Sequence, residues 1–62
     1  MAMYIKCLNK QKQKYICAVL IENNICFSFK NDLKLHIESN EFINNVDLML
    51  KIEANSCTIY GN

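Results

Sequence analysis

The fold of this chain is constrained most by two apolar segments that flank a pair of asparagines. The first segment runs from Tyr15 to Glu22 and the second from Ile25 to Phe29, with Asn23-Asn24 between them. Asparagine tolerates positive φ, which suits a two-residue β-hairpin turn, so the two segments are expected to pair as antiparallel strands. One face of this hairpin is wholly apolar and is the expected core: Ile16, Ala18, Leu20, Ile25, Phe27 and Phe29.

The segments on either side of the hairpin predict two further strands. Positions 33, 35 and 37 are apolar and alternate with polar residues at 34, 36 and 38, which is the pattern of a half-buried strand. A three-residue loop at 30–32, with Asn31 or Asp32 at positive φ, keeps the apolar side chains on one face, whereas a shift of one residue would mix the faces. A tight turn near Gln11-Lys12 adds residues 3–8 as the first strand and brings Met3, Ile5 and Cys7 to the core face.

The C-terminal third allows two interpretations. Residues 47–54 alternate between polar and apolar side chains, which predicts a strand that turns at Asn55-Ser56 after a short helical turn at 40–45. However, Phe42, Ile43, Val46, Met49 and Leu50 also share one helical face. We therefore predict a mainly β fold, an antiparallel meander of five or six short strands in a small sandwich or barrel. The alternative is an α+β fold with a helix at about 40–51 packed on a four-stranded sheet.

The length of the chain limits it to one small domain, residues 1–62. A chain of 62 residues buries only about 60% of its unfolded surface, so folding alone is marginal. Apolar residues make up 52% of the sequence, which is barely enough to offset the entropy lost on folding. We therefore expect help from a partner subunit, as in a homodimer or a larger homo-oligomer.

Four cysteines lie at positions 7, 17, 26 and 57. The N-terminus lacks a signal-peptide pattern, and no apolar run approaches the roughly 20 residues that span a bilayer. These features predict a cytoplasmic protein with reduced thiols and no membrane partner. In the predicted hairpin Cys17 and Cys26 are too far apart for a disulfide. Cys7 and Cys57 fall on the core face, where free cysteine acts as a small apolar residue.

The sequence offers little for catalysis, metal binding or cofactor binding. Zinc ligands usually come in close pairs, and these cysteines are widely spaced. The sole glycine is Gly61, so a glycine-rich phosphate loop is excluded. The predicted strands place His36 opposite Cys26, but no third residue orients the pair and a flat sheet provides no cleft. We expect no enzyme, no catalytic residue, no metal and no cofactor.

Charge is distributed unevenly, although the net charge is only +1. Residues 1–31 hold five lysines and one glutamate, and residues 32–62 hold two lysines and five acids. The basic side chains expected around the first hairpin are Lys6, Lys10, Lys12 and Lys14, with Tyr4 and Tyr15 close by. Small β proteins bind single-stranded nucleic acid with basic grooves and stacked aromatics, although lysines also protect edge strands from aggregation. Single-stranded nucleic-acid binding is therefore the alternative function.

The face opposite the predicted core is also apolar over the first two strands. Its residues are Ala2, Tyr4, Leu8, Tyr15, Cys17, Val19 and Ile21. A sheet that is apolar on both sides needs two covers. The second cover is either residues 40–60 or another molecule, since large exposed apolar patches mark interfaces. We predict an interface formed by Tyr4, Leu8, Tyr15, Cys17, Val19 and Ile21.

The leading expectation is a non-catalytic protein-interaction module, oligomeric, that acts as an inhibitor or adaptor on another protein. The sequence is rich in asparagine, isoleucine and lysine and has no arginine. This composition is typical of A/T-rich coding and favours a phage or mobile-element source.

Overall fold

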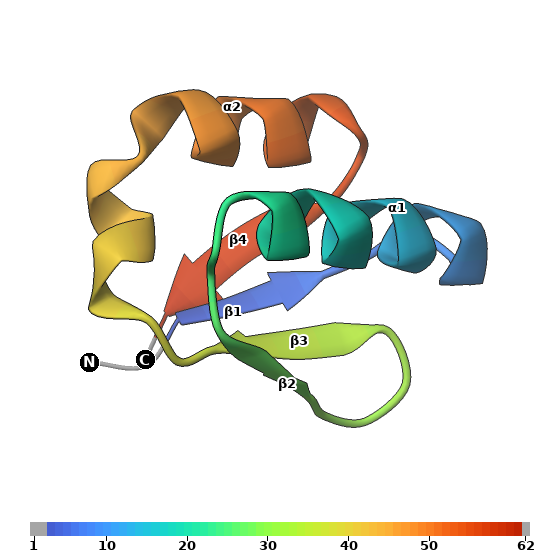
Figure 1. The fold of residues 1–62 in the computed structure, drawn as a ribbon. Helices are drawn as coiled ribbons and strands as arrows, with labels where there is room; N and C mark the ends of the chain where they lie inside the picture. Colours follow the sequence, from blue (N-terminus) through green and yellow to red (C-terminus); the bar gives the residue numbers. More distant parts are fainter. Residues whose placement is uncertain (1–2, 62) are drawn as a thin grey trace.

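The computed structural model describes residues 3–61 and shows an α+β fold (Figure 1). In chain order the elements are β1 (Met3–Lys6), α1 (Lys10–Glu22), β2 (Phe27–Phe29), β3 (Lys34–Ile37), the 3-10 helix η1 (Asn40–Asn44), α2 (Val46–Ala54) and β4 (Thr58–Gly61). The strands form one antiparallel sheet in the order β2-β3-β1-β4. This βαββαβ order, with the first and third strands in the centre, is the split βαβ topology of ferredoxin-like folds.

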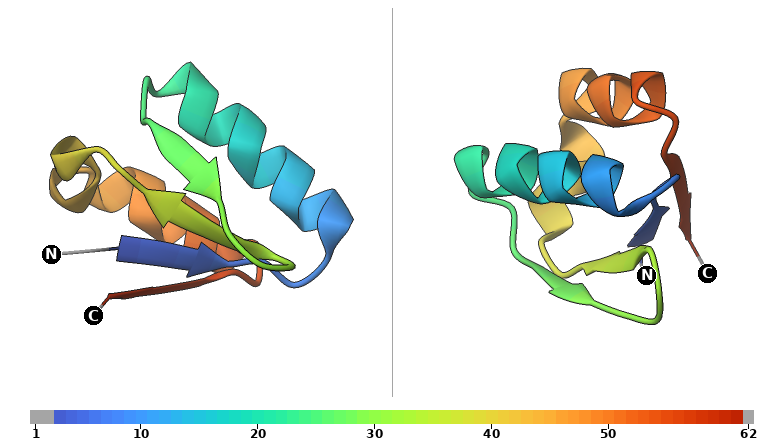
Figure 2. Two further views of the ribbon diagram at one scale, coloured as in Figure 1. Left: turned by 90° about the horizontal axis from the view of Figure 1, so that it is seen from below. Right: turned by 90° about the vertical axis from the view of Figure 1, so that its right-hand side faces the viewer.

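Both helices lie on the same face of the sheet, so the molecule has two layers (Figure 2). The core is the space between the layers, and each element contributes to it through the side chains that face the other layer. Its buried residues are Ile5, Cys7, Ile16, Val19, Leu20, Ile25, Leu35, Ile37, Phe42, Leu48, Ile52 and Cys57. No helix formed by residues 3–61 lies on the opposite face of the sheet.

The mainly β meander is wrong, and the main reason is the segment 10–22. This segment is the helix α1, which buries Ile16, Val19 and Leu20 at helical spacing. Asn9 caps its N-terminus, because the Asn9 side chain accepts a hydrogen bond from the Lys12 backbone N–H at 2.8 Å. Glutamine and lysine at 10–14 are good helix formers, so a turn near 11–12 does not form.

The two asparagines after this segment end a helix instead of making a hairpin turn. Asn24 adopts φ 58°, and the backbone N–H of Ile25 bonds to the carbonyl of Leu20 at 2.9 Å. The Asn24 N–H bonds to the Ile21 carbonyl at 3.1 Å. Together these bonds form a Schellman motif, which needs a left-handed residue just after the helix. Positive φ at this asparagine pair was expected and is found at Asn24, but there it ends a helix and does not form a hairpin turn.

The hairpin of β2 and β3 exists, but its register differs from the prediction by two residues. Phe29 pairs with Leu35, and Phe27 pairs with Ile37. A shift of two residues preserves the faces, so Leu35 and Ile37 are still buried. Asp32 in the connecting turn has φ 51°, which confirms the left-handed residue expected there.

In the C-terminal third the helical turn expected at 40–45 is confirmed by η1, but residues 46–54 form helix α2 and not a strand. The alternative prediction has the correct class, α+β. However, the bounds of its helix, about 40–51, are wrong, and so is the set of residues expected on the buried face of that helix. Leu48 and Ile52 point into the core, while Val46 and Leu50 are exposed. The chain does turn at residues 55–56, where Ser56 has φ 64° and leads into β4.

Replacing Asn9 with alanine is expected to lower the free energy of unfolding by about 1 kcal/mol, because the first turn of α1 loses its side-chain cap. Chemical denaturation followed by circular dichroism measures this change. Asn44→Ala is the matched control, since Asn44 is exposed at the end of η1. Equal losses in the two variants would contradict the capping role of Asn9.

Candidate nucleic-acid interface

The sheet face that points away from the helices carries aromatic and basic side chains. Successive residues of a strand point to opposite faces, and Ile5 and Leu35 are fully buried against the helices. Their neighbours in β1 and β3 therefore point to the open face. The residues placed there by this alternation and by the strand register are Tyr4, Lys6, Ser28, Lys34, His36, Thr58 and Tyr60.

Three aromatic rings form a row across the open face. Tyr4 on β1 pairs with His36 on β3 and with Tyr60 on β4. The Tyr4 and His36 ring centroids are 5.1 Å apart, and those of Tyr4 and Tyr60 are 5.5 Å apart with nearly parallel planes at 24°. All three residues are half-buried. The row therefore offers a continuous aromatic surface across three strands.

A row of basic side chains lies beside the aromatic row. Lys6 and Lys34 are direct cross-strand partners, and like charges in this position destabilise a sheet. Lys30 at the end of β2 adds a third amino group, and it joins Tyr4, Lys34 and Tyr60 in lining a shallow hollow of about 360 Å³. Three lysines beside exposed ring surface form a site suited to an anion that also carries flat apolar groups.

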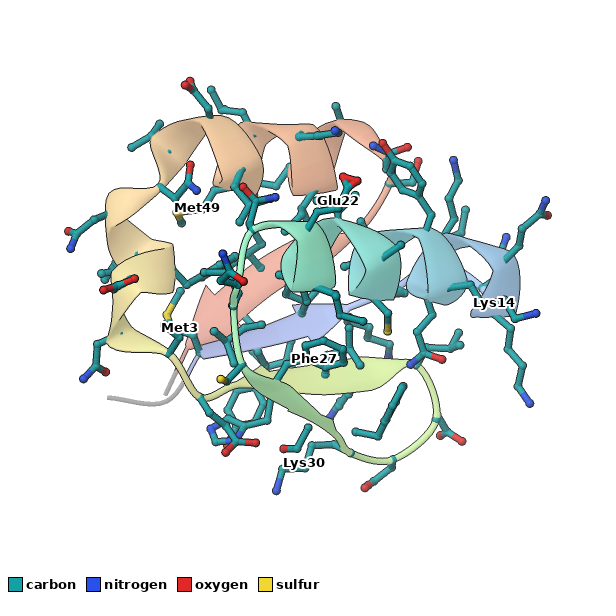
Figure 3. All side chains as sticks on the ribbon, viewed as in Figure 1. Met3, Lys14, Glu22, Phe27, Lys30 and Met49 are labelled. Carbon is teal, nitrogen blue, oxygen red and sulfur yellow. The ribbon has the colours of Figure 1, made fainter. Side chains whose placement is uncertain are left out.

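Four of the six acidic residues lie on the helical layer, whereas Asp32 is in the turn between β2 and β3, and Glu38 directly follows β3 on the side of the open face. Glu22 ends α1, and Glu41, Asp47 and Glu53 lie on η1 and α2. Figure 3 shows Glu22 on the helical layer and Lys30 on the far side of the sheet. The open face therefore carries Lys6, Lys30 and Lys34 against the single carboxylate of Glu38, which makes it locally basic although the net charge of the chain is only +1.

The basic residues selected from the sequence do not all lie together. Lys6 is on the open face beside Tyr4, but Lys10, Lys12 and Lys14 belong to the first half of α1. Tyr15 is also on α1, where it is 42% exposed. The expected basic cluster depended on a hairpin at 3–22. Because residues 10–22 form α1 instead, Lys10, Lys12, Lys14 and Tyr15 lie on the helical layer, away from Tyr4 and Lys6.

The six residues of the expected protein interface are dispersed for the same reason. Val19 is buried in the core, whereas Tyr4 faces the open side of the sheet. Leu8, in the loop after β1, is exposed. Cys17 and Ile21 line a groove between α1 and the edge strand β2, together with Ala18 and the exposed Phe29. The one apolar strand face that was expected therefore does not form.

The thiols do not form the site considered for Cys26 and His36. His36 pairs with Ser28, and Cys26 lies two pairs further along, where its carbonyl accepts the Glu38 backbone N–H. All four cysteines are free. Among residues 3–61, no group of three or more histidine, cysteine or acidic side chains is arranged to hold a metal ion.

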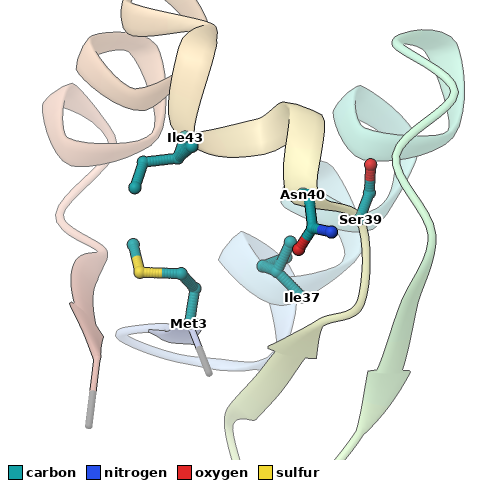
Figure 4. A pocket seen from close by; sticks show the side chains of 5 residues that line it. All are labelled: Met3, Ile37, Ser39, Asn40 and Ile43. Carbon is teal, nitrogen blue, oxygen red and sulfur yellow. The ribbon is translucent and has the colours of Figure 1, made fainter. Parts of the chain in front are cut away.

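A second hollow lies at one end of the sheet, between β1, the end of β3 and η1 (Figure 4). Its volume is about 140 Å³, below the roughly 300 Å³ typical of small-molecule sites. Met3 and Ile43 face each other across it, and the Ser39 hydroxyl oxygen already accepts the Glu41 backbone N–H at 3.3 Å. This hollow is mainly apolar and holds no catalytic arrangement.

Comparison with known proteins found no matching family model, no matching curated protein and no matching solved structure. Within the part of the chain that the structure describes, no helix has the length and apolar character needed to cross a bilayer.

Several residues of the open face were not recognised from the sequence. The alternation of residues 33–38 predicts Lys34 and His36 on a polar face but indicates no binding role for them, and no local pattern singles out Lys30 or Tyr60. The sequence did contain one signal. Tyr4 and Lys6 are two residues apart, as are Lys34 and His36, so each of these strands has one aromatic and one basic side chain on the same face. What was missing was the pairing of β1 with β3 and β4, which are distant in sequence.

Proposed function

We propose that the open face of the sheet binds single-stranded nucleic acid. The observation that carries this proposal is the row of Tyr60, Tyr4 and His36 rings beside the lysine pair Lys6 and Lys34. Bases stack on exposed aromatic rings, and lysines neutralise the phosphates between them. Four-stranded sheets of the same topology bind RNA by stacking two or three bases on such rings.

The lysine pair supports a phosphate ligand in particular. Lysines that are direct cross-strand partners repel each other, and an anion bound between their amino groups would relieve the loss of stability. The absence of arginine from the sequence removes the side chain best suited to bidentate recognition of guanine. The expected ligand is therefore a flexible single strand that is bound with little sequence preference.

A salt series with a short fluorescent oligothymidylate tests the proposal by anisotropy. Three lysines that neutralise three phosphates of a single strand predict a slope of about −2 for log K against log salt. Binding should therefore weaken by roughly 20-fold between about 50 and 200 mM salt. No binding at low salt, or a slope near zero, would contradict the proposal.

Lys34→Ala separates binding from stability. Removing this charge is expected to bring the salt slope closer to zero by about 0.7, while the free energy of unfolding rises by a few tenths of a kcal/mol because the repulsion from Lys6 disappears. Lys14→Ala removes the same charge from α1 and should leave the slope unchanged. A larger loss of binding in the Lys14 variant would place the nucleic acid on the helical layer.

The oligomeric protein-interaction module stays a prediction. Its specific support is the set of exposed apolar residues between α1 and β2, where Ile21 is 66% and Phe29 is 65% exposed. Sedimentation at micromolar concentration measures the oligomeric state, and Ile21→Lys should dissociate an oligomer that uses this surface. A monomeric wild-type protein would contradict the prediction. Val19 is unsuitable for this test, because a buried lysine would unfold the chain.

A further inference from the structure

Cys7 and Cys57 are brought together by the pairing of β1 with β4. Cys7 directly follows β1, and Cys57 directly precedes β4. The last pair of the ladder joins Lys6 to Thr58, so the two cysteines lie directly beyond it, at the positions that would pair next. Both are almost fully buried, at 3% and 4% exposure. Two thiols distant in sequence therefore lie opposite each other in the core.

The backbone geometry places this pair where antiparallel strands approach most closely. The Cys7 N–H donates to the carbonyl of Leu33 on the β3 side at 2.8 Å, so the peptide groups of Cys7 point away from β4. Opposite residues that do not exchange hydrogen bonds have Cα atoms about 4.5 Å apart. A disulfide needs a Cα separation of about 4.4–6.8 Å, so this position accepts a disulfide with little movement of the backbone.

The protonation of Cys7 supports the same contact. The pKa of Cys7 is raised from 9.0 to about 12, first by burial and then by the neighbouring Cys57 thiol. Cys17 on α1 contributes least to this shift. Because Cys7 is protonated at neutral pH, it is a poor first nucleophile.

We propose that Cys7 and Cys57 are a redox-active pair that forms a reversible disulfide with a low-molecular-weight disulfide, such as oxidised glutathione, as the oxidant. Cys57 loses its proton and attacks one glutathione sulfur, which releases one reduced glutathione and leaves a mixed disulfide. Cys7 then loses its proton and attacks the Cys57 sulfur, which releases the second reduced glutathione. Two protein thiols are oxidised, and one glutathione disulfide is reduced to two thiols.

Access to the buried pair is through β4. This strand lies at the edge of the sheet and pairs with β1, and local opening of such an edge exposes the groups beneath it. Cys57 is at the start of this strand and is therefore exposed before Cys7. We expect oxidation to be slower than the reaction of the exposed Cys26, which forms only mixed disulfides.

The test is incubation of the folded protein with oxidised glutathione, followed by acid quenching, alkylation of free thiols and peptide mapping. A Cys7–Cys57 cross-linked peptide, with Cys17 and Cys26 alkylated or glutathionylated, is the expected result. The matched variant Cys17→Ser/Cys26→Ser retains only the pair and should lose two hydrogens in its intact mass. Cys57→Ala should form no intramolecular bond; if it does not fold, the double-serine variant alone decides the test.

A thermal melt shows whether the bond fits the folded state. The link joins residues near the two ends of the described chain, so it strongly restricts the unfolded chain, and the melting temperature of the double-serine variant should rise by about 10 °C or more. Dithiothreitol should reverse the rise. Only glutathione adducts, a Cys7–Cys17 link, persistently free thiols or a lowered melting temperature would each overturn the proposal. None of these outcomes depends on nucleic-acid binding.

Discussion

Replacing Tyr4 with alanine is expected to weaken the binding of single-stranded nucleic acid by about 5- to 150-fold, the equivalent of roughly 1–3 kcal/mol for one lost stacking platform. Tyr4 is the central ring of the row and lies within 5.5 Å of both neighbours, measured between ring centroids. Its loss removes one platform and separates the other two. Fluorescence anisotropy with the same oligothymidylate measures the change.

Two variants isolate the contribution of the ring. Tyr4→Phe keeps the ring face and should bind within about a factor of five of wild type, since the lost hydroxyl contributes at most one hydrogen bond of about 1 kcal/mol. Tyr15→Ala makes the same truncation on α1, on the other layer, and should leave the affinity unchanged. If Tyr15→Ala weakened binding as much as Tyr4→Ala, the open face would not be the binding surface.

A stability measurement accompanies the Tyr4 variants. Each cross-strand aromatic pair contributes roughly 0.2–1 kcal/mol to a sheet, so Tyr4→Ala should lower the free energy of unfolding modestly. We expect the variant to stay folded under the binding conditions, in which case its loss of affinity reports on stacking and not on unfolding. A variant that unfolded would point to a structural role, and Tyr60→Ala on the edge strand would then be the decisive substitution.

The alternation of side chains predicted the strand faces better than it predicted the strands. Ile5, Leu35 and Ile37 were expected in the core and are buried, because the side-chain period of a strand survives an error of two residues in register. For residues 15–22 the same reasoning failed. A short apolar run fits a buried helix as well as a strand, and the features that favour the helix, the Asn9 cap and the helix-forming residues at 10–14, lie outside the run.

The candidate site was only partly predictable because it is assembled from non-neighbouring strands. Tyr4 and Lys6 were selected from the sequence, and both lie on the open face. Their partners His36 and Tyr60 come from strands about 30 and 55 residues away, and nothing local to β1 specifies that it pairs with both. Two helices connect these strands; α1 was not predicted, and a helix near α2 was expected only in the alternative fold, with different bounds.

Phe42→Ala is expected to unfold the protein or leave it at the edge of stability. Phe42 is fully buried, and truncation of a core phenylalanine costs about 3–5 kcal/mol. A domain of 62 residues has a total stability of roughly 3–9 kcal/mol, so a single side chain holds a large share of it. Circular dichroism and urea denaturation measure the loss.

The neighbouring Ile43→Ala is the control for this prediction, because Ile43 is 51% exposed and surface truncations usually change stability by about 0.5 kcal/mol or less. Comparing the stabilities of the Phe42 and Ile43 variants tests how much η1 contributes to the core. The short element η1 has little stability of its own as a 3-10 helix, yet its Phe42 is fully buried and is part of the core. If the Phe42 variant were as stable as the Ile43 variant, the core between α1, α2 and the sheet would be stable without the Phe42 ring.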